Sequence, residues 1–481
     1  MQSSDGRARW PGLLVAGLAG CAGSVALVLG GAAVGSIPRP HRYRWWLHAG
    51  SLGYHAGYAL TYAGVAVLTA SWIAVGRHAR ARELTPRRAW ALLGLWGTPL
   101  ALGAPVFSRD LYSYVADGVL ARRGFNPYVA SPHLLAGGPL YDSIAQVWRH
   151  APSPYGPLFE ILAHATASAA GGSLIAQVLA FRLLAVIGVA ALMAVVPALA
   201  RRFGADPGVA LWLTALSPLA LFGAVSSGHN DALMLALLAV GLYLFQRGQR
   251  VGAAALIALA ATVKIPALAG LLFVYAGAWS AIDPRRRWRL ATEAVAVTGA
   301  VFAAVTGLAG YGWRWLSPSA LSIPTQLHVL ITPVVAVGVL LASGLHAIGA
   351  HAATRGVVTA TQHVGEALAV VGIVVIVCRT RADNVIRALG AALLLAVWLS
   401  PTVWPWYFWW GVTVLSVTGA QRSRFLALAA GGAMLLVGPG GTPMIGGNGY
   451  LVAGPAVILV TAWFVASRRA SAWLSGVDRA G

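Results

Sequence analysis

Long apolar stretches separated by short basic loops run along the whole chain. A membrane-spanning helix needs about 20 mainly apolar residues. The apolar runs predict spans at residues 12–36, 50–76, 89–106, 173–200, 208–225, 229–246, 250–263, 265–281, 290–310, 358–378, 385–400, 405–419, 424–439 and 449–467. The pattern therefore predicts an all-α integral membrane protein with about 12–14 transmembrane helices, since several of these runs are short enough to merge or break.

The arginines give these spans an orientation. Basic residues concentrate in cytoplasmic loops, and Arg clusters occupy every second predicted loop, at residues 77–88, 201–202, 247–250, 285–289, 379–387, 422–424 and 468–469. This alternation requires that two apolar segments, 157–170 and 328–350, do not cross and lie as re-entrant or interfacial segments on the outer side. Irregular backbone at membrane depth is tolerated where it lines a cavity, so an outer cavity is expected.

Composition excludes other classes of protein. Hydrophobic residues make up 58% of the chain and charged residues 10%, too few charges for a soluble globule. The net charge of +21 would suggest nucleic-acid binding in a soluble protein, but here it is spread over loops, so no nucleic-acid partner is expected. The two cysteines lie far apart, and the Gly-rich stretch at 438–449 lacks the Lys that ends a nucleotide-binding loop.

The spans and loops divide the chain into four regions. Residues 1–88 hold two N-terminal transmembrane helices and a basic cytoplasmic loop, and the first helix is interpreted as a retained signal anchor with its N-terminus inside. Residues 89–310 form a core whose first outer loop spans 107–172. Residues 311–357 form the second outer loop with its re-entrant segment, and residues 358–481 hold the C-terminal transmembrane helices.

The first outer loop holds a candidate catalytic carboxylate. Asp110 directly follows the third predicted span, where it could act as a general base. It could equally be a helix N-terminal acid that the helix dipole favours. Asp110, Tyr114 and Asp117 have helical spacing, which predicts an amphipathic interfacial helix in this loop.

A few cations lie at membrane depth or on the outer side. Arg182 falls inside a predicted span, where it needs a partner such as a backbone carbonyl, Glu160 or a lipid phosphate. Lys264 is the only lysine and could snorkel or bind a phosphate. His229 precedes a helix start at which Asn230 or Asp231 could serve as the cap, so capping does not explain it.

Six segments together resemble a known family. They are SRDLYSYVADGVLARRGFNPY, SPYGPLF, SSGHNDALM, ATVKIPAL, PTQLH and SPTVWPWYFWW. Over roughly residues 85–420 they resemble the polyprenol-phosphate-mannose-dependent α-1,6-mannosyltransferases of actinobacterial lipomannan assembly, which belong to the GT-C superfamily of multispanning glycosyltransferases. The resemblance implies an inverting enzyme that transfers mannose from polyprenyl-phosphate-mannose to a growing α-1,6-mannan on a lipid anchor, the core of lipomannan and lipoarabinomannan, at the outer face of the cytoplasmic membrane.

The resemblance also assigns roles to residues. It places the catalytic carboxylate, acting as the base, at Asp110. Many GT-C enzymes have two adjacent acidic residues there, whereas this chain has Arg109 before Asp110, so neither a divalent metal nor another cofactor is expected. A phosphate leaving group needs one base and no protein acid. The expected donor-phosphate ligands are Arg182, His229, Lys264 and His328. The expected sugar or acceptor contacts are Tyr112, Tyr114, Asn126, Tyr155, Asn230, Asp231, Gln326, Trp406 and Tyr407.

Other functions remain open from the residues. A GT-C transferase for another lipid-linked sugar, such as arabinofuranose or glucose, would carry the same features. A transporter or flippase for lipid-linked sugars should show repeat symmetry and polar residues at mid-membrane; no such repeat is visible, and the candidates cluster toward one face. A structural scaffold would leave Asp110 and the outer cations unexplained. The sequence does not specify an oligomeric state.

Overall fold

The computed structural model describes residues 10–36, 52–317, 332–401, 403–419, 431 and 438–441, which contain helices and loops and no strand. The longer helices are α1 (Trp10–Val34), α2 (Tyr54–Arg80), α3 (Pro86–Leu102), α4 (Asp110–Arg122), α6 (Pro157–Ala170), α7 (Leu174–Arg202), α9 (Asp231–Gln246), α10 (Arg250–Ala261), α11 (Leu268–Ala281), α12 (Arg287–Ala309), α14 (Pro333–Ala347), α15 (Thr354–Cys378) and α16 (Val385–Leu399). Shorter elements connect them: η3 (Pro132–Leu135), α5 (Pro139–Ser143), η4 (Gln146–Trp148), α8 (Pro207–Leu213), η5 (Leu219–Ser226, π-helical), η6 (Ile265–Ala267), η7 (Pro284–Arg286), η8 (Trp313–Leu316), η10 (His351–Ala353), η11 (Pro405–Tyr407) and α17 (Phe408–Ser416).

Length and composition confirm a multispanning membrane protein. Five helices of the described chain can cross a membrane: Pro11–Val34, α2, α7, Pro284–Ala309 and α15. A sixth span results if η5 and α9, which meet at a 117° bend, count as one. Further apolar helices are shorter, so the total of about 12–14 remains a prediction. The expected spans at 424–439 and 449–467 lie almost wholly outside the described residues.

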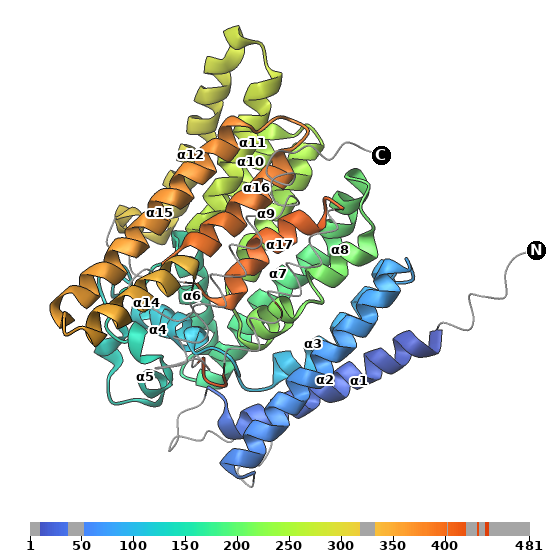
Figure 1. Ribbon diagram of the computed structural model, residues 1–481, viewed down its shortest axis with the longest axis vertical. Coiled ribbons are helices and arrows are strands. Elements are labelled where there is room, and N and C mark those ends of the chain that lie inside the picture. Colours follow the sequence, from blue (N-terminus) through green and yellow to red (C-terminus); the bar gives the residue numbers. More distant parts are fainter. Residues whose placement is uncertain are drawn as a thin grey trace, which may run out of the picture.

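The N-terminal pair α1 and α2 packs through small residues along one edge of the molecule (Figure 1). A Cβ on Gly23 would come within 2.8 Å of the backbone nitrogen of Leu68, so only glycine permits this separation of the two helices. Such close backbone contact is common between membrane helices because lipid supplies no hydrophobic force to hold them together. The α1–α2 pair then lies against α3 and α8, which connect it to the core.

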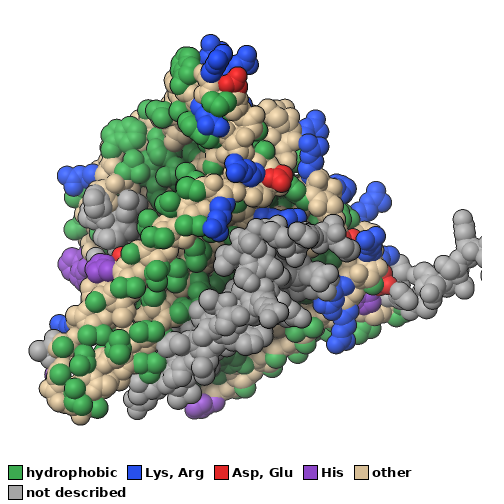
Figure 2. All heavy atoms as spheres, turned by 45° about the horizontal axis from the view of Figure 1, so that its top comes forward, with side chains coloured by type: hydrophobic (Ala, Val, Ile, Leu, Met, Phe, Trp, Pro, Cys, Tyr) green, Lys and Arg blue, Asp and Glu red, His purple; other side chains and the backbone are tan. Residues whose placement is uncertain are grey.

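Three of the loops predicted to be cytoplasmic meet at one end of the core. Arg202 at the end of α7, Arg247 after α9 and Ala382 before α16 line one surface hollow of about 580 Å³. The backbone N–H of Ala382 donates to Ser280 in α11. Most Lys and Arg side chains visible in Figure 2 lie toward its upper and right edges, beside a broad hydrophobic surface. The helix ends that carry these arginines therefore share one side of the membrane body.

The two apolar segments predicted not to cross the membrane are short helices. Helix α6 covers Pro157–Ala170, the predicted segment, and α14 covers Pro333–Ala347 within the predicted 328–350. With 14 and 15 residues they are shorter than the roughly 20 that a span needs. Helix α6 packs on α4 and α7, so it forms part of the wall that encloses α4.

The prediction of an amphipathic interfacial helix in the first outer loop is half wrong. Helix α4 exists, but every residue from Asp110 to Ala121 is buried, so none of its faces meets water or lipid. Gly118 explains how closely α6 covers it, because a Cβ there would collide with the backbone carbonyl of Ala163. Helix α4 therefore holds its polar side chains inside the protein and not at a membrane surface.

Candidate active site

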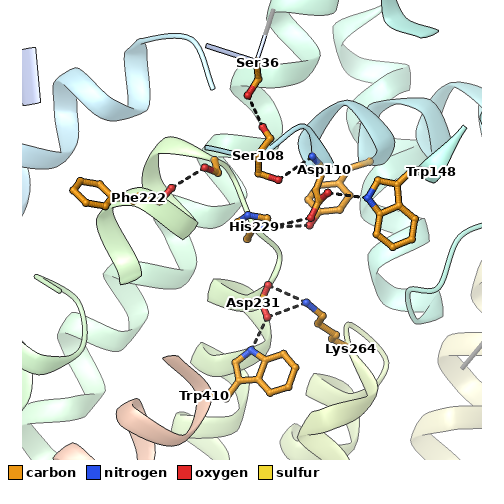
Figure 3. Close-up of polar contacts among 11 residues, drawn as sticks. Ser36, Ser108, Asp110, Trp148, Phe222, His229, Asp231, Lys264 and Trp410 are labelled. Carbon is orange, nitrogen blue, oxygen red and sulfur yellow. Dashed lines mark hydrogen bonds and ion pairs between the residues drawn. The ribbon is translucent and has the colours of Figure 1, made fainter. Parts of the chain in front are cut away.

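Asp110 is the first residue of α4 and lies at the centre of a cluster of polar groups (Figure 3). The hydroxyl of Ser108 accepts a hydrogen bond from the Asp110 backbone N–H at 3.1 Å, a local turn contact just before the helix. The indole N–H of Trp148 donates to carboxylate Oδ1 at 2.9 Å. Oδ1 is thus engaged, while Oδ2 faces the loop that carries His229.

The charge state of Asp110 suits a base. Burial raises its pKa to about 6, against the opposing effects of the Trp148 and Ser108 hydrogen bonds and the charge of Lys264. The charge of Asp231 raises the pKa further. A carboxyl with a pKa of about 6 is mostly ionised at pH 7 yet more basic than an ordinary aspartate.

His229 lies opposite Asp110, although the two are far apart in sequence. Its Nδ1 is 3.7 Å from Asp110 Oδ2 and 3.4 Å from the Tyr114 hydroxyl. The imidazole stacks on Trp406, with ring centroids 4.0 Å apart. Its Nε2 is buried and has no hydrogen-bond partner in the described part of the chain. The structure therefore brings three of the predicted site residues, His229, Tyr114 and Trp406, to Asp110.

Lys264 and Asp231 form an ion pair next to these groups. The ammonium of Lys264 bonds both Asp231 oxygens, at 2.9 and 3.0 Å, and the Trp410 indole donates to Oδ1 at 2.5 Å. The ammonium also lies 4.7 Å from the centroid of the Tyr407 ring, a cation–π contact. Asp231 is fully buried and its oxygens are occupied, whereas Lys264 is 13% exposed and keeps one N–H for another acceptor.

Arg182 in α7 lies near the site, because its guanidinium bonds backbone carbonyls of the segments that lead to Asp110 and His229. Nε and Nη2 donate to the Ser226 carbonyl at 3.1 and 2.6 Å. Nη1 donates to the carbonyls of Ala101, at 3.0 Å, and Gly103. The sequence left open whether a carbonyl or a phosphate satisfies this cation, and the geometry favours the carbonyls because four N–H groups already point at them.

Two further predicted contacts have structural partners. The Asn126 amide donates to the Tyr311 carbonyl at 2.9 Å, and its oxygen accepts from the Tyr128 backbone N–H at 2.9 Å. This arrangement closes a turn and leaves little for a sugar. The ring of Tyr155 packs edge-on against Tyr114, with centroids 5.1 Å apart.

Two predicted contact residues keep unused polar groups, and two predicted site residues cannot be placed. The Tyr112 hydroxyl and both amide atoms of Asn230 are buried without a partner in the described residues. Buried polar groups normally have partners, so these atoms are open to a bound sugar or water. Gln326 and His328 lie outside the described residues.

Sequence reasoning missed the residues that complete the site. Trp148 and Trp410 fix the two carboxylates, but they are two of 19 tryptophans and no local pattern distinguishes them. Ser153 was also missed; its hydroxyl donates to Glu160 at 2.6 Å. Burial raises the pKa of Glu160 and of the neighbouring Asp117.

No group of three or more His, Cys, Asp or Glu side chains in the described residues has the spacing of a metal site. That the enzyme works without a metal remains a prediction from the sequence.

Comparisons with known proteins identify the family. Residues 17–281 match the family model for the N-terminal domain of α-(1→6)-mannopyranosyltransferase, and residues 331–468 match that for the MptB C-terminal domain. α-(1→6)-Mannopyranosyltransferase A of Mycobacterium tuberculosis is 32% identical over 86% of this chain and 81% of its own length. The enzyme of the same name from Corynebacterium glutamicum is 32% identical over 53% of this chain and 57% of its own length. α-(1→6)-Mannopyranosyltransferase B of that organism is 28% identical over 67% of this chain and 57% of its own length. No solved structure matches the chain. The chain therefore belongs to the α-(1→6)-mannopyranosyltransferase family and is a membrane-embedded mannosyltransferase.

Proposed function

We propose that this mannosyltransferase moves mannose from polyprenyl-phosphate-mannose to the 6-hydroxyl of a growing α-1,6-mannan on a lipid anchor, outside the cytoplasmic membrane. The names of the relatives support mannosyl transfer and the α-1,6 linkage. The observation that carries the chemistry is the Asp110 carboxylate, with Oδ1 held by Trp148 and Oδ2 free of a hydrogen bond shorter than 3.5 Å. A held carboxylate with one open oxygen suits a general base.

The reaction follows from these groups. Asp110 Oδ2 takes the proton of the acceptor hydroxyl while the hydroxyl oxygen attacks C1 of the mannose from the face opposite the phosphate. The bond between C1 and the phosphate oxygen breaks, its electron pair leaves with the polyprenyl phosphate, and the configuration at C1 inverts. Because the departing phosphate is a weak base, no protein acid is needed.

Lys264 is the best-placed cation for the departing phosphate. It is part-exposed, keeps one N–H free, and acts electrostatically on Asp110 from within the same site. A fixed cation that faces developing negative charge lowers the barrier without reorganisation. Trp406 and Tyr407 lie in the same site, but Trp406 is buried and stacks on His229 and Trp404, and Tyr407 stacks on Trp410 and contacts the Lys264 ammonium. Both rings are therefore already engaged within the protein, and stacking of a sugar on them stays a prediction.

The position of the site along the helices supports an outer location. Helix α9 begins at Asp231 in the site and ends at Gln246, beside the Arg-rich end. Its 16 residues separate the two by about 24 Å. Helix α3 likewise runs from the basic loop at 77–88 to the connector before Asp110. Since the basic end faces the cytoplasm under the positive-inside rule, the site belongs at the opposite face.

We also propose that transfer needs no divalent metal, because Arg109 occupies the place of a second acid. The Arg109 guanidinium donates to the Ser143 carbonyl at 3.3 Å, so this position carries a cation held by the protein backbone and not a second carboxylate. Transfer should then be unchanged by a chelator such as EDTA, and loss of activity that Mg²⁺ or Mn²⁺ restores would contradict this proposal.

The test of the catalytic assignment is Asp110→Asn, measured as transfer of labelled mannose in membranes supplied with polyprenyl-phosphate-mannose. Loss of a general base should lower the rate by about 10²–10⁴-fold. Asp206→Asn is the matched control, since Asp206 caps α8 away from the site and the amide can still accept from Val209. Full activity of the Asp110 variant would overturn the assignment. Better incorporation from a polyprenyl-phosphate-arabinofuranose donor would favour the alternative sugar.

A further inference from the structure

Two stretches of irregular backbone bring the catalytic groups together. The connector at residues 103–109, between α3 and α4, leads to Asp110. The turn at residues 226–230, which begins at the last residue of η5 and precedes α9, carries His229. Residues 103–108 and 226–230 are buried, so their carbonyl groups cannot bond bulk water. In a low-dielectric interior each such carbonyl needs a partner from the protein.

Arg182 supplies that partner for both stretches at once. From α7 its guanidinium reaches Ser226, three residues before His229, and Ala101 and Gly103, which precede Asp110. The side chain is 1% exposed. Among the described residues no carboxylate forms an ion pair with it, so its bonds are to backbone carbonyls. The planar guanidinium thus links the connector before Asp110 to the turn before His229, two segments that are far apart in the sequence.

The connector has other supports, but none of them reaches the His229 turn. Ser36, just after α1, donates from its hydroxyl to the carbonyls of Val106 and Ser108, at 3.3 and 3.0 Å. The Gly440 N–H donates to the Val106 carbonyl at 2.7 Å. These bonds hold the connector to a residue just after α1 and to one near the C-terminal limit of the described residues. Within the described residues, Arg182 is the side chain that bonds both the connector region and the turn before His229.

The turn is packed tightly against the same side chain. Gly228 has φ +70°, in the left-handed region, and a Cβ there would lie 3.6 Å from Arg182 Cγ and would collide with the side chain of Leu111 in α4. A small residue is therefore required at the point where the turn meets α4. The distance between Asp110 and His229 depends on this packing together with the guanidinium bonds.

We propose that Arg182 is a positioning residue that clamps the two loops so that Asp110 and His229 face one another. The inference rests on the proposed function, because its consequence is read as mannosyl transfer. Lysine cannot replace the arginine: an ammonium is a single point with three donors, whereas the guanidinium presents five donors in a plane and spans carbonyls on two sides. A positioning residue controls kcat, whereas a residue that binds the donor phosphate would control the donor KM, so kinetics distinguish the two roles.

The experiment measures kcat and the donor KM for Arg182→Lys and Arg182→Ala. Misplacement of a catalytic group by about 1 Å can cost 10²-fold, so kcat should fall by about that factor while the donor KM changes less than about threefold. Added guanidinium ion should partly restore the Ala variant. Arg250→Lys is the matched control, because Arg250 pairs with Glu293 at the basic end and should keep normal kinetics.

The opposite kinetic result would overturn the proposal. A raised donor KM with unchanged kcat would make Arg182 a phosphate ligand, and a Lys variant with normal kcat would show that the clamp is not needed. If the Arg182 variants do not fold, Gly228→Ala provides the second test, because it pushes the turn away from α4 and leaves Arg182 intact. This variant should lower kcat in the same way as the Arg182 variants, and a normal kcat would refute the proposal. Asp110→Asn, assayed in parallel, separates the two hypotheses: its activity reports on the proposed base and not on the clamp.

Discussion

The hydrogen bond from Trp148 to Asp110 should set the pH dependence of the enzyme. Trp148→Phe keeps an aromatic ring in the same buried position and removes only the indole N–H, which donates to Asp110 Oδ1 at 2.9 Å. That bond stabilises the ionised carboxylate and lowers its pKa. Its loss must therefore raise the pKa, and a base that must be ionised to act then loses activity on the acidic side.

The size of the effect follows from the strength of such a bond. A hydrogen bond to a charged group is worth about 1.5–3 kcal/mol, and each pKa unit corresponds to about 1.4 kcal/mol. The lower figure moves the pKa of Asp110 from about 6 to about 7. At pH 6 the ionised fraction then falls from about one half to about one tenth, roughly a fivefold loss, whereas at pH 8 both forms are at least about nine-tenths ionised.

The assay is the pH profile of kcat/KM between pH 5 and 9, with saturating acceptor and labelled donor in membranes. The acid limb of the Trp148→Phe profile should lie about one unit above that of the wild type, with nearly equal plateaus. Trp315→Phe is the matched control, because Trp315 is also buried and donates its N–H to Thr306, away from Asp110. A reduced plateau with an unshifted acid limb would refute the reasoning, since it would mean that Trp148 only supports the loop.

Two further predictions concern the other buried charges. Lys264→Met should raise the donor KM, because the phosphate loses its cation, and lower the melting temperature in detergent, because Asp231 loses its counter-charge. The double variant Lys264→Met with Asp231→Asn should recover the melting temperature but not the donor KM. Recovery of both quantities would exclude a contact between Lys264 and the phosphate. Burial raises the pKa of Glu160 to about 8, so the folded protein keeps a proton that the unfolded chain releases above the ordinary pKa of a glutamate. The melting temperature of the wild type should therefore fall as the pH rises towards 8. Glu160→Gln has no proton to lose at this position, so its melting temperature should fall less between pH 6 and 9. A Gln variant with the pH dependence of the wild type would contradict this assignment.

Local signals were sufficient to predict most of the helices. The bounds of α6 agree with the expected 157–170 because Pro157 and Gly171 mark its ends in the sequence itself. The arginine clusters predict the orientation, and three of the loops that carry them meet at one surface hollow; which side of the membrane this end faces stays a prediction. The environment of α4 could not be predicted, because its helical spacing of polar residues is the same for a helix at an interface and for one whose polar side chains face a buried site.

Candidate site residues could be identified one by one from the sequence, but their arrangement in space could not. Asp110, His229 and Lys264 stood out because each carries a polar group in apolar surroundings. Their contacts arise from tertiary packing, which no spacing in the chain encodes. Asn126 was assigned to sugar binding, although its position before a proline is typical of a turn, which is its observed role.

The few carboxylates near the site divide their roles according to their partners. A buried charge needs a counter-charge or hydrogen bonds. Asp231 receives Lys264, which leaves its oxygens occupied and unable to take a proton from a substrate. Glu160 receives only the hydroxyl of Ser153, and burial raises its pKa to about 8, so it holds a proton at pH 7 and cannot accept another. Asp110 lies between these cases. It accepts one hydrogen bond from the Trp148 indole, and the charge of Lys264 lowers its pKa without direct contact, so it is mostly ionised at neutral pH and keeps one oxygen open. That intermediate environment makes Asp110 alone of the three suitable as the base.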